Sequence, residues 1–282
     1  MSDPTQVLDD LDDESRQLDL IVSQLTEHQW VLATPAPRWT IAHQIAHLVW
    51  TDRAALLAVT EPDAFAVELE KAVAAPDTFV DDGAEEGAKA APGELLDRWR
   101  LGRGALQAAL RGAAPGARFP WFGPAMSAAS LATGRLMETW AHGQDVADAL
   151  GVTRAPTERL RHIARIGVRA RDFAFGVRGL AAPEEEFRVE LVPPGVSSGS
   201  NGVGSGALWA YGPESAPQRV TGPALDFCLL VTRRAHRSDL ALHAQGPDAD
   251  RWLDIAQAFA GPAGTGRPPK GTAAGAPEQV AE

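Results

Sequence analysis

Helical periodicity over residues 5–175 constrains this chain more than any other feature of its sequence. Within residues 5–34, apolar side chains recur at spacings of three and four, and acidic residues occupy the opposite face. The apolar stripe consists of Val7, Leu11, Leu18, Ile21, Val22 and Leu25. Such a stripe predicts an amphipathic helix that buries one face against other elements.

Four further helices are predicted, over residues 40–60, 93–111, 127–150 and 157–175. Thr40 is a suitable N-cap and Gly151 a suitable C-cap. Residues 62–92 are mixed in character, with a short helix expected near 65–73 and a loop after it. The sequence FPWFGP at 119–124 predicts a rigid turn. Four or five amphipathic helices with short connections predict a bundle.

The pattern changes after Pro183. Residues 187–192 (FRVELV) alternate between apolar and polar side chains, as a half-buried strand does. Short strands are also predicted at 207–211, 218–221 and 240–244, and helices at 225–234 and 249–260. The Gly/Ser-rich residues 195–206 are predicted to form a hairpin loop.

The fold class predicted from these patterns is α+β. Residues 1–182 are expected to form a four- to five-helix bundle, and residues 183–262 a smaller α/β domain. Residues 263–282 are rich in Pro, Gly and Ala and are expected to be a disordered tail.

Charge and hydropathy exclude several functional classes. The formal net charge is −11 and basic runs are short, so we expect no nucleic-acid binding, which requires clustered Lys and Arg. The sequence has no run of about 18 apolar residues, so we expect no membrane span. Residues 1–13 are acidic and lack the apolar core of a signal peptide, so we expect a cytoplasmic protein. The single cysteine, Cys228, lies in the apolar run LDFCLLV and is expected to be a buried core thiol.

Two pairs of polar residues recur at helical spacing. Glu138 and His142 are four apart in one predicted helix, and His43 and His47 are four apart in another. Residues four apart share a helix face, so a carboxylate and an imidazole can reach one ion. Each pair alone is more often an ordinary surface or core feature. Two imidazoles and one carboxylate on neighbouring helices would leave open positions around a divalent ion, as catalytic zinc sites do.

The residues around these pairs resemble the DinB-like superfamily, which includes mycothiol-dependent maleylpyruvate isomerase. Arg38-Trp39-Thr40 followed by a helix ending at His47-Leu48 is similar to one half of its signature. Glu138-x-x-x-His142-Gly143-Gln144-Asp145 is similar to the other half. The resemblance covers most of residues 5–178. It implies that His47, Glu138 and His142 hold Zn²⁺ or another divalent metal such as Ni²⁺, Co²⁺ or Fe²⁺.

The C-terminal part extends the resemblance. Residues 220–226 (VTGPALD), followed by an apolar helix ending at Arg233-Arg234, look like the isomerase's C-terminal domain, which is similar to sterol-carrier-protein folds. This implies a functional role for Arg234 in holding a substrate anion, with Arg233 as the neighbouring candidate if the register shifts by one. The runs PWFGP and METWAHGQDVADALG look most like an uncharacterised actinobacterial subgroup known only as metal-binding proteins.

Two further residues are candidates for the site. Asp52 lies one turn past His47 and could accept a hydrogen bond from a metal-bound imidazole, act as a general base, or pair with Arg53 or Arg135. Trp121, in the Pro/Gly-rich turn before the metal helix, is the preferred candidate for a pocket wall.

Three functional hypotheses follow. In the first, the metal activates an external thiol, implied by the resemblance to be mycothiol, for isomerisation or S-transfer on a small, electrophilic and anionic substrate. In the second, the metal activates water for hydrolysis. In the third, the protein binds a metal or an apolar small molecule without catalysis. The chain is expected to act as a monomer or homodimer.

Overall fold

The computed structural model describes residues 4–195, 208–261, 264 and 266–271. Contacts divide the chain into two compact units, one ending at Ile166 and the other beginning at Gly167. The sequence pattern placed the boundary later, between residues 182 and 183. The difference arises because α9 (Arg171–Gly176) packs against a helix of the second unit, α11 (Pro247–Ile255).

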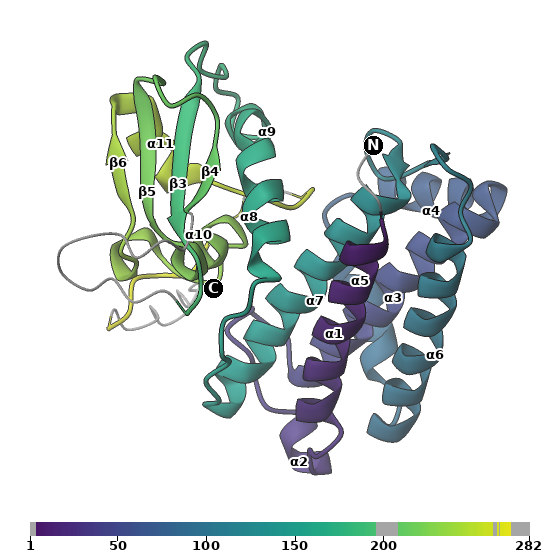
Figure 1. Ribbon diagram of the computed structural model, residues 1–282. Helices are drawn as coiled ribbons and strands as arrows, with labels where there is room; N and C mark the ends of the chain where they lie inside the picture. Colours follow the sequence, from purple (N-terminus) through teal and green to yellow (C-terminus); the bar gives the residue numbers. More distant parts are fainter. Residues whose placement is uncertain (1–3, 196–207, 262–263, 265, 272–282) are drawn as a thin grey trace, which may run out of the picture. The chain divides into compact units, whose positions relative to one another are not determined.

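The first unit is helical (Figure 1). Its long helices are α1 (Thr5–Val22), α3 (Ile41–Thr60), α6 (Pro92–Arg111) and α7 (Ala128–Leu150). Helix α3 packs against α6 and α7, and α1 packs against the same two helices, so the four enclose one core. Its fully buried side chains include Leu18, Ile41, Ile45, Leu48, Trp99 and Val146.

Shorter elements complete this unit. They are α2 (Glu27–Trp30), α4 (Pro62–Ala74), α5 (Phe79–Ala88), the start of α8 (Leu160–Arg169), and the strands β1 (Arg118–Phe119) and β2 (Met126–Ser127). The two strands pair antiparallel, so the predicted turn at 119–124 closes a short hairpin.

The predicted helix starts and stops are largely confirmed. Thr40 caps α3 through a capping box with His43, and Gly151 ends α7 in the left-handed conformation, with φ of 66°. The prediction that one helix continues to residue 34 is wrong. Helix α1 ends at Val22, and a capping box between Thr26 and Gln29 starts the separate helix α2.

Helix α5 was expected to be a loop, and that expectation is wrong. Its acidic residues at 81–86 lie mostly on the outer side of a helix, while Ala84 is fully buried. Glycine permits its close approach to α3, because a Cβ on Gly87 would lie 2.8 Å from the Cβ of Ala46. Helix α5 therefore lies directly over the segment of α3 that carries His43 and His47.

The second unit is a four-stranded sheet with helices. Its strands are β3 (Phe187–Val192), β4 (Trp209–Tyr211), β5 (Gln218–Pro223) and β6 (His243–Gln245), in the order β4-β3-β5-β6. Strands β3 and β5 are parallel, and the other pairs are antiparallel.

Alternation along β3 buries Phe187, Val189 and Leu191. Helices α10 (Ala224–Val231) and α11 cover the sheet, and Trp252 of α11 contacts the rings of both Phe187 and Phe227, with centroids 5.6 and 5.7 Å apart. Cys228 lies on α10 and is fully buried, as predicted.

Most predicted elements of this unit are confirmed, with shifted ends. The last strand runs from His243 to Gln245 rather than over 240–244, because Gly246 and Pro247 then begin α11. Nearly all of the predicted hairpin loop (196–206) and most of the predicted tail (262–263, 265 and 272–282) lie outside the described residues.

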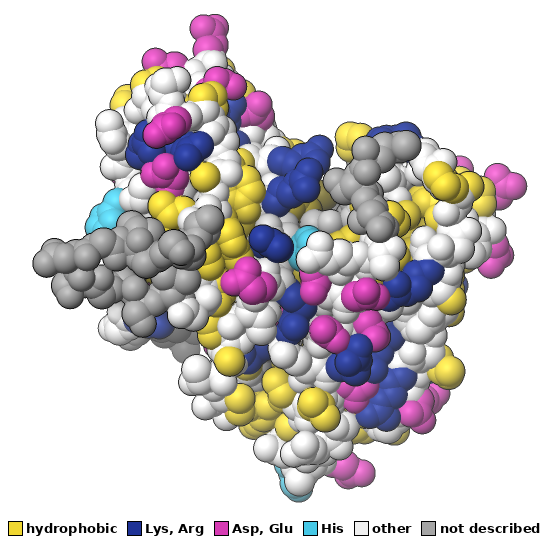
Figure 2. All heavy atoms as spheres, viewed as in Figure 1, with side chains coloured by type: hydrophobic (Ala, Val, Ile, Leu, Met, Phe, Trp, Pro, Cys, Tyr) yellow, Lys and Arg dark blue, Asp and Glu magenta, His cyan; other side chains and the backbone are white. Residues whose placement is uncertain are grey.

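Charged side chains of both signs are mixed on the face of the bundle that carries α1 and α6 (Figure 2). Ion pairs link these two helices, including Arg100 with Asp19 at 2.6 Å and Arg111 with Asp9 at 2.7 Å. Within the described residues, no helix is long and apolar enough to span a membrane.

Candidate metal centre

The three predicted metal ligands converge between α3 and α7. His47 projects from α3, and Glu138 and His142 project from successive turns of α7. Oε2 of Glu138 lies 3.4 Å from Nε2 of His47 and 3.1 Å from Nε2 of His142. The three ligand atoms all lie within 4.8 Å of one another, a spacing that one metal ion can bridge.

The hydrogen bonds behind His142 test whether a cation fits here. Gln44 of α3 places its Oε1 2.5 Å from Nδ1 of His142, while its Nε2 donates to the hydroxyl of Thr34 at 2.9 Å. That hydroxyl in turn donates to the carbonyl of Trp39 at 2.8 Å. The chain of donors makes Oε1 of Gln44 an acceptor, so Nδ1 of His142 carries the proton.

A neutral His142 then directs the lone pair of Nε2 toward the carboxylate of Glu138. Two lone pairs at 3.1 Å repel each other unless a cation lies between them or a proton makes the imidazole positive. The donor set of two imidazole nitrogens and one carboxylate oxygen is the set that binds zinc and similar divalent ions. The residues present therefore fit a metal.

The carboxylate of Glu138 is anionic. Burial raises its pKa, but hydrogen bonds from His142 and His47, together with the charge of Arg135, outweigh burial and hold the pKa well below its usual range. Its side chain is 17% exposed, compared with 8% for His47 and 11% for His142. The carboxylate thus marks the more accessible side of the cluster.

Sequence reasoning missed Gln44. It is fully buried and lies three residues before His47, in an otherwise apolar helix. A buried amide in such a run was the available signal, because a buried polar group requires a partner. The structure assigns it the orientation of a ligand imidazole, a contribution that commonly changes metal affinity by about 10–100-fold.

We expect Gln44→Leu to weaken zinc binding by about 10–100-fold, because His142 loses the acceptor that sets its tautomer. Competition against a chromogenic chelator measures the affinity. Gln44→Glu is the matched control, since it keeps an acceptor oxygen facing Nδ1 and should recover most of the affinity. Equal zinc affinity in the leucine variant and the wild type would contradict this role for Gln44.

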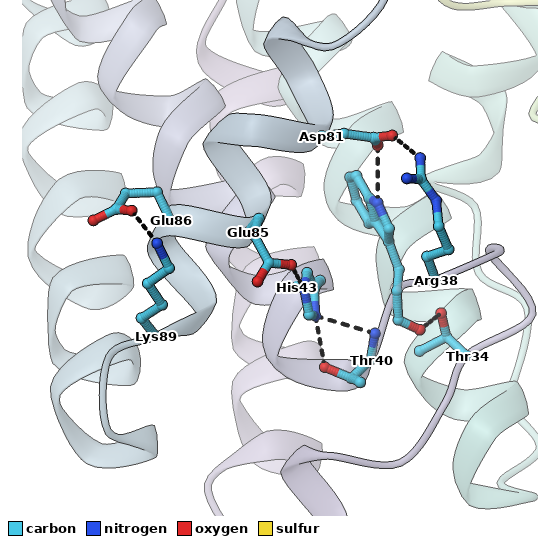
Figure 3. Close-up of polar contacts among 9 residues, drawn as sticks. Thr34, Arg38, Thr40, His43, Asp81, Glu85, Glu86 and Lys89 are labelled. Carbon is cyan, nitrogen blue, oxygen red and sulfur yellow. Dashed lines mark hydrogen bonds and ion pairs between the residues drawn. The ribbon is translucent and has the colours of Figure 1, made fainter.

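Trp39 forms an aromatic wall beside the ligands. Its ring stacks on His142, with centroids 5.9 Å apart and planes at 22°, and lies 5.3 Å from the ring of His47. Figure 3 shows how α5 holds this residue: Asp81 accepts a hydrogen bond from the indole Nε1 at 3.0 Å and also binds Arg38. Sequence reasoning noted Trp39 only as part of the motif.

His43 lies outside the three-residue cluster. Its Nδ1 contacts the hydroxyl of Thr40 at 2.8 Å, and its Nε2 contacts Glu85 of α5 at 2.9 Å (Figure 3). The same two contacts close the capping box and attach α5 to α3. His43 thus serves in hydrogen bonding and capping, the role that a histidine on this helix has by default.

A second group of aromatic rings lies on the other side of His47. Trp50 lies 5.9 Å from the His47 ring, and Phe79 and Phe122 lie 5.0 and 6.2 Å from Trp50. Trp121 belongs to this group, contacting Phe122 at 5.2 Å, and is therefore separated from His47 by two rings. Its role as a pocket wall remains a prediction.

Asp52 is buried on α3, one turn past His47. Burial raises its pKa to about 6, although the charges of Arg135 and Arg103 act in the opposite direction. No hydrogen bond joins Asp52 to either ligand imidazole in the part of the chain that the structure describes. Its catalytic role remains a prediction, and the acceptor observed behind His142 is Gln44.

Arg233 and Arg234 belong to the second unit and directly follow α10. Arg233 has a positive φ of 61°, and burial and the nearby charge of Arg178 lower its pKa. Nη1 of Arg234 donates to the carbonyl of Thr232 at 2.7 Å. Their roles toward a substrate remain predictions.

Comparisons with known proteins agree with the geometry of the bundle. Residues 11–147, which include all three candidate ligands, match the family model described as the mycothiol maleylpyruvate isomerase N-terminal domain. Two uncharacterised proteins of Mycobacterium tuberculosis, from strains CDC 1551 and H37Rv, are 55% identical over 267 residues. The matches cover 95% of this chain and 100% of each relative. The chain belongs to the DinB-like, maleylpyruvate isomerase superfamily.

The superfamily assignment extends to the fold. The crystal structure of the mycothiol-dependent maleylpyruvate isomerase matches 88% of this chain and 96% of its own, with a TM-score of 0.56 at 15% identity. A structure of a histidine-to-alanine mutant of that enzyme gives the same values. At this identity the likeness shows the α+β fold alone. Residues 203–245 also match a family model described as wyosine base formation.

Proposed function

We propose that this protein is a metal-dependent enzyme that uses an external low-molecular-weight thiol, mycothiol, to isomerise or S-conjugate a small electrophilic substrate. The observation that carries the proposal is the convergence of His47, Glu138 and His142 on one point in a domain of the maleylpyruvate isomerase superfamily. We further propose cytoplasmic action as a monomer or homodimer, with no nucleic-acid partner.

The three ligands would hold Zn²⁺ and leave at least one coordination position open. When bound, the metal supplies a lower pKa for a thiol that reaches that position. Glu138 brings one negative charge to the ion, and Gln44 orients the imidazole of His142. The rings of Trp39 and Trp50 flank the imidazoles and limit the access of water.

The thiol must come from outside the chain. Cys228, the single cysteine, is fully buried on α10 of the second unit. An external thiolate adds to an electrophilic carbon of the substrate, forming a C–S bond as the electron pair of the double bond moves to an adjacent carbonyl. Rotation followed by loss of the thiolate gives an isomer, and protonation with retention of the C–S bond gives a conjugate.

Cobalt substitution tests thiol binding at the metal directly. We expect mycothiol to produce a thiolate-to-cobalt charge-transfer band in the Co²⁺-loaded wild type. S-methyl mycothiol, which lacks an ionisable thiol, should produce none. Thiol-dependent turnover of cis-unsaturated 2-oxo acids is then measured with the zinc-loaded protein.

Other outcomes point to the other functions. Metal-dependent cleavage of esters or amides without added thiol would replace the proposal with a hydrolase. Absence of both the band and any turnover, together with tight binding of an apolar ligand, would replace it with a carrier.

A further inference from the structure

Arg135 is a buried guanidinium whose nitrogen atoms lack acceptors. Its residue exposure is 5%, and it projects from α7 one turn before Glu138. Its Nε and Nη1 are both buried, and neither has a hydrogen-bond partner among the described residues. Arg135 also forms no ion pair with any described carboxylate.

This condition is energetically costly, since a buried charge requires hydrogen-bond partners to offset its lost hydration. The other arginines of the same bundle meet that requirement. Arg103 binds Asp19 and the carbonyl of Ser15, and Arg154 binds Glu14 and the carbonyl of Trp140. Arg135 therefore has donors available for a group that is not part of the chain.

The position of Arg135 directs those donors to the metal centre. Residues three apart on a helix share a face, so Arg135 lies on the Glu138 side of α7. Its charge lowers the pKa of both Glu138 and Asp52, which places it close to these carboxylates. The ring of Trp121 lies 5.4 Å from the guanidinium carbon and holds it from one side.

We propose that Arg135 binds a carboxylate of the substrate beside the metal centre, so that the ligand bridges the metal and the guanidinium. This inference rests on the proposed function, and it names the substrate class as a small carboxylic acid. The planar fork of a guanidinium matches the two oxygens of a carboxylate, with two parallel hydrogen bonds. A divalent metal and Arg135 together give this end of the bundle an excess of positive charge that an anion would neutralise.

Calorimetric titration of maleate into the zinc-loaded full-length protein tests the inference. Maleate has two carboxylates and no thiol, so its binding is measured independently of thiol chemistry. We expect Arg135→Gln to weaken maleate binding by at least about 30-fold, the effect of losing one partner of a buried charged hydrogen-bond pair. Arg135→Lys should restore part of the affinity.

Arg103→Gln is the matched control. It removes the same charge from the same bundle, and Arg103 also lies over an indole ring, with 4.5 Å to the centroid of Trp99. Because Arg103 already has protein partners, its loss should leave maleate affinity unchanged but lower the melting temperature. The zinc-loaded, ligand-free Arg135→Gln variant should melt no lower than the wild type, because it loses no protein hydrogen bond.

Equal maleate affinity in Arg135→Gln and the wild type would overturn the inference, while zinc and mycothiol binding would still stand. A melting temperature of Arg135→Gln below that of Arg103→Gln would also overturn it, by showing a structural role. Arg135-dependent maleate binding in a protein that never binds mycothiol would support the inference and reject the thiol chemistry alone.

Discussion

A His47→Ala, His142→Ala double variant is expected to contain no bound zinc, whereas the wild type should contain about one zinc per chain. The two substitutions remove both imidazole nitrogens and leave Glu138 as the single ligand of the cluster. A lone carboxylate does not compete with water and chelators for zinc. Elemental analysis of the purified proteins measures this directly.

His43→Ala is the control for this experiment. It removes an imidazole from the same helix, one turn before His47, but His43 contacts Thr40 and Glu85 rather than the cluster. Zinc content should therefore remain at the wild-type level. Zinc retained by the double variant, or absent from the wild type after zinc loading, would refute the proposed site and the metal-dependent function with it.

The second large effect is expected for stability, at Glu14 of α1. This carboxylate is 1% exposed and binds two arginines from the segment after α7, Arg154 and Arg159, the latter with an Nε–Oε2 distance of 2.9 Å. Glu14→Ala should lower the free energy of unfolding by about 3–5 kcal/mol, because it leaves two buried guanidinium groups without their shared anion. Urea denaturation followed by circular dichroism measures the change.

Glu94→Ala provides the comparison for Glu14. Glu94 pairs with Arg98 at 2.5 Å on the surface of α6, where both side chains are more than half exposed. Its loss should change the free energy of unfolding by only about 0.3–0.5 kcal/mol. If the two variants destabilise the protein equally, the buried triad does not hold α1 to the segment after α7.

The main helices and the metal ligands could be predicted from sequence for a local reason. Glu138 and His142 share a helix face because they are four residues apart, and that geometry depends only on the helix. The same holds for the cap at Thr40 and the stop at Gly151, where one residue type satisfies one backbone requirement. Placing His47 opposite them depended on the resemblance to a known superfamily.

The remaining features of the site depend on contacts distant in sequence. Gln44 lies 98 positions from the imidazole it orients, and Trp39 lies 42 positions from the carboxylate that holds its indole. Helix α5 was expected to be a loop because its acidic face hides the one fully buried alanine, Ala84. Such partners become visible only when packing brings the helices together.

The sequence by itself therefore determined the α+β fold class, most helix boundaries, the buried cysteine, and the residue types and spacing of a metal site. The tertiary structure alone decided which polar groups are satisfied: Gln44 behind His142, Glu14 between two arginines, and Arg135 with buried nitrogens that no described group accepts. Helix periodicity acts over a few residues and can be read along the chain. Burial and hydrogen-bond satisfaction are properties of the assembled core, because the cost of a buried charge depends on every group packed around it.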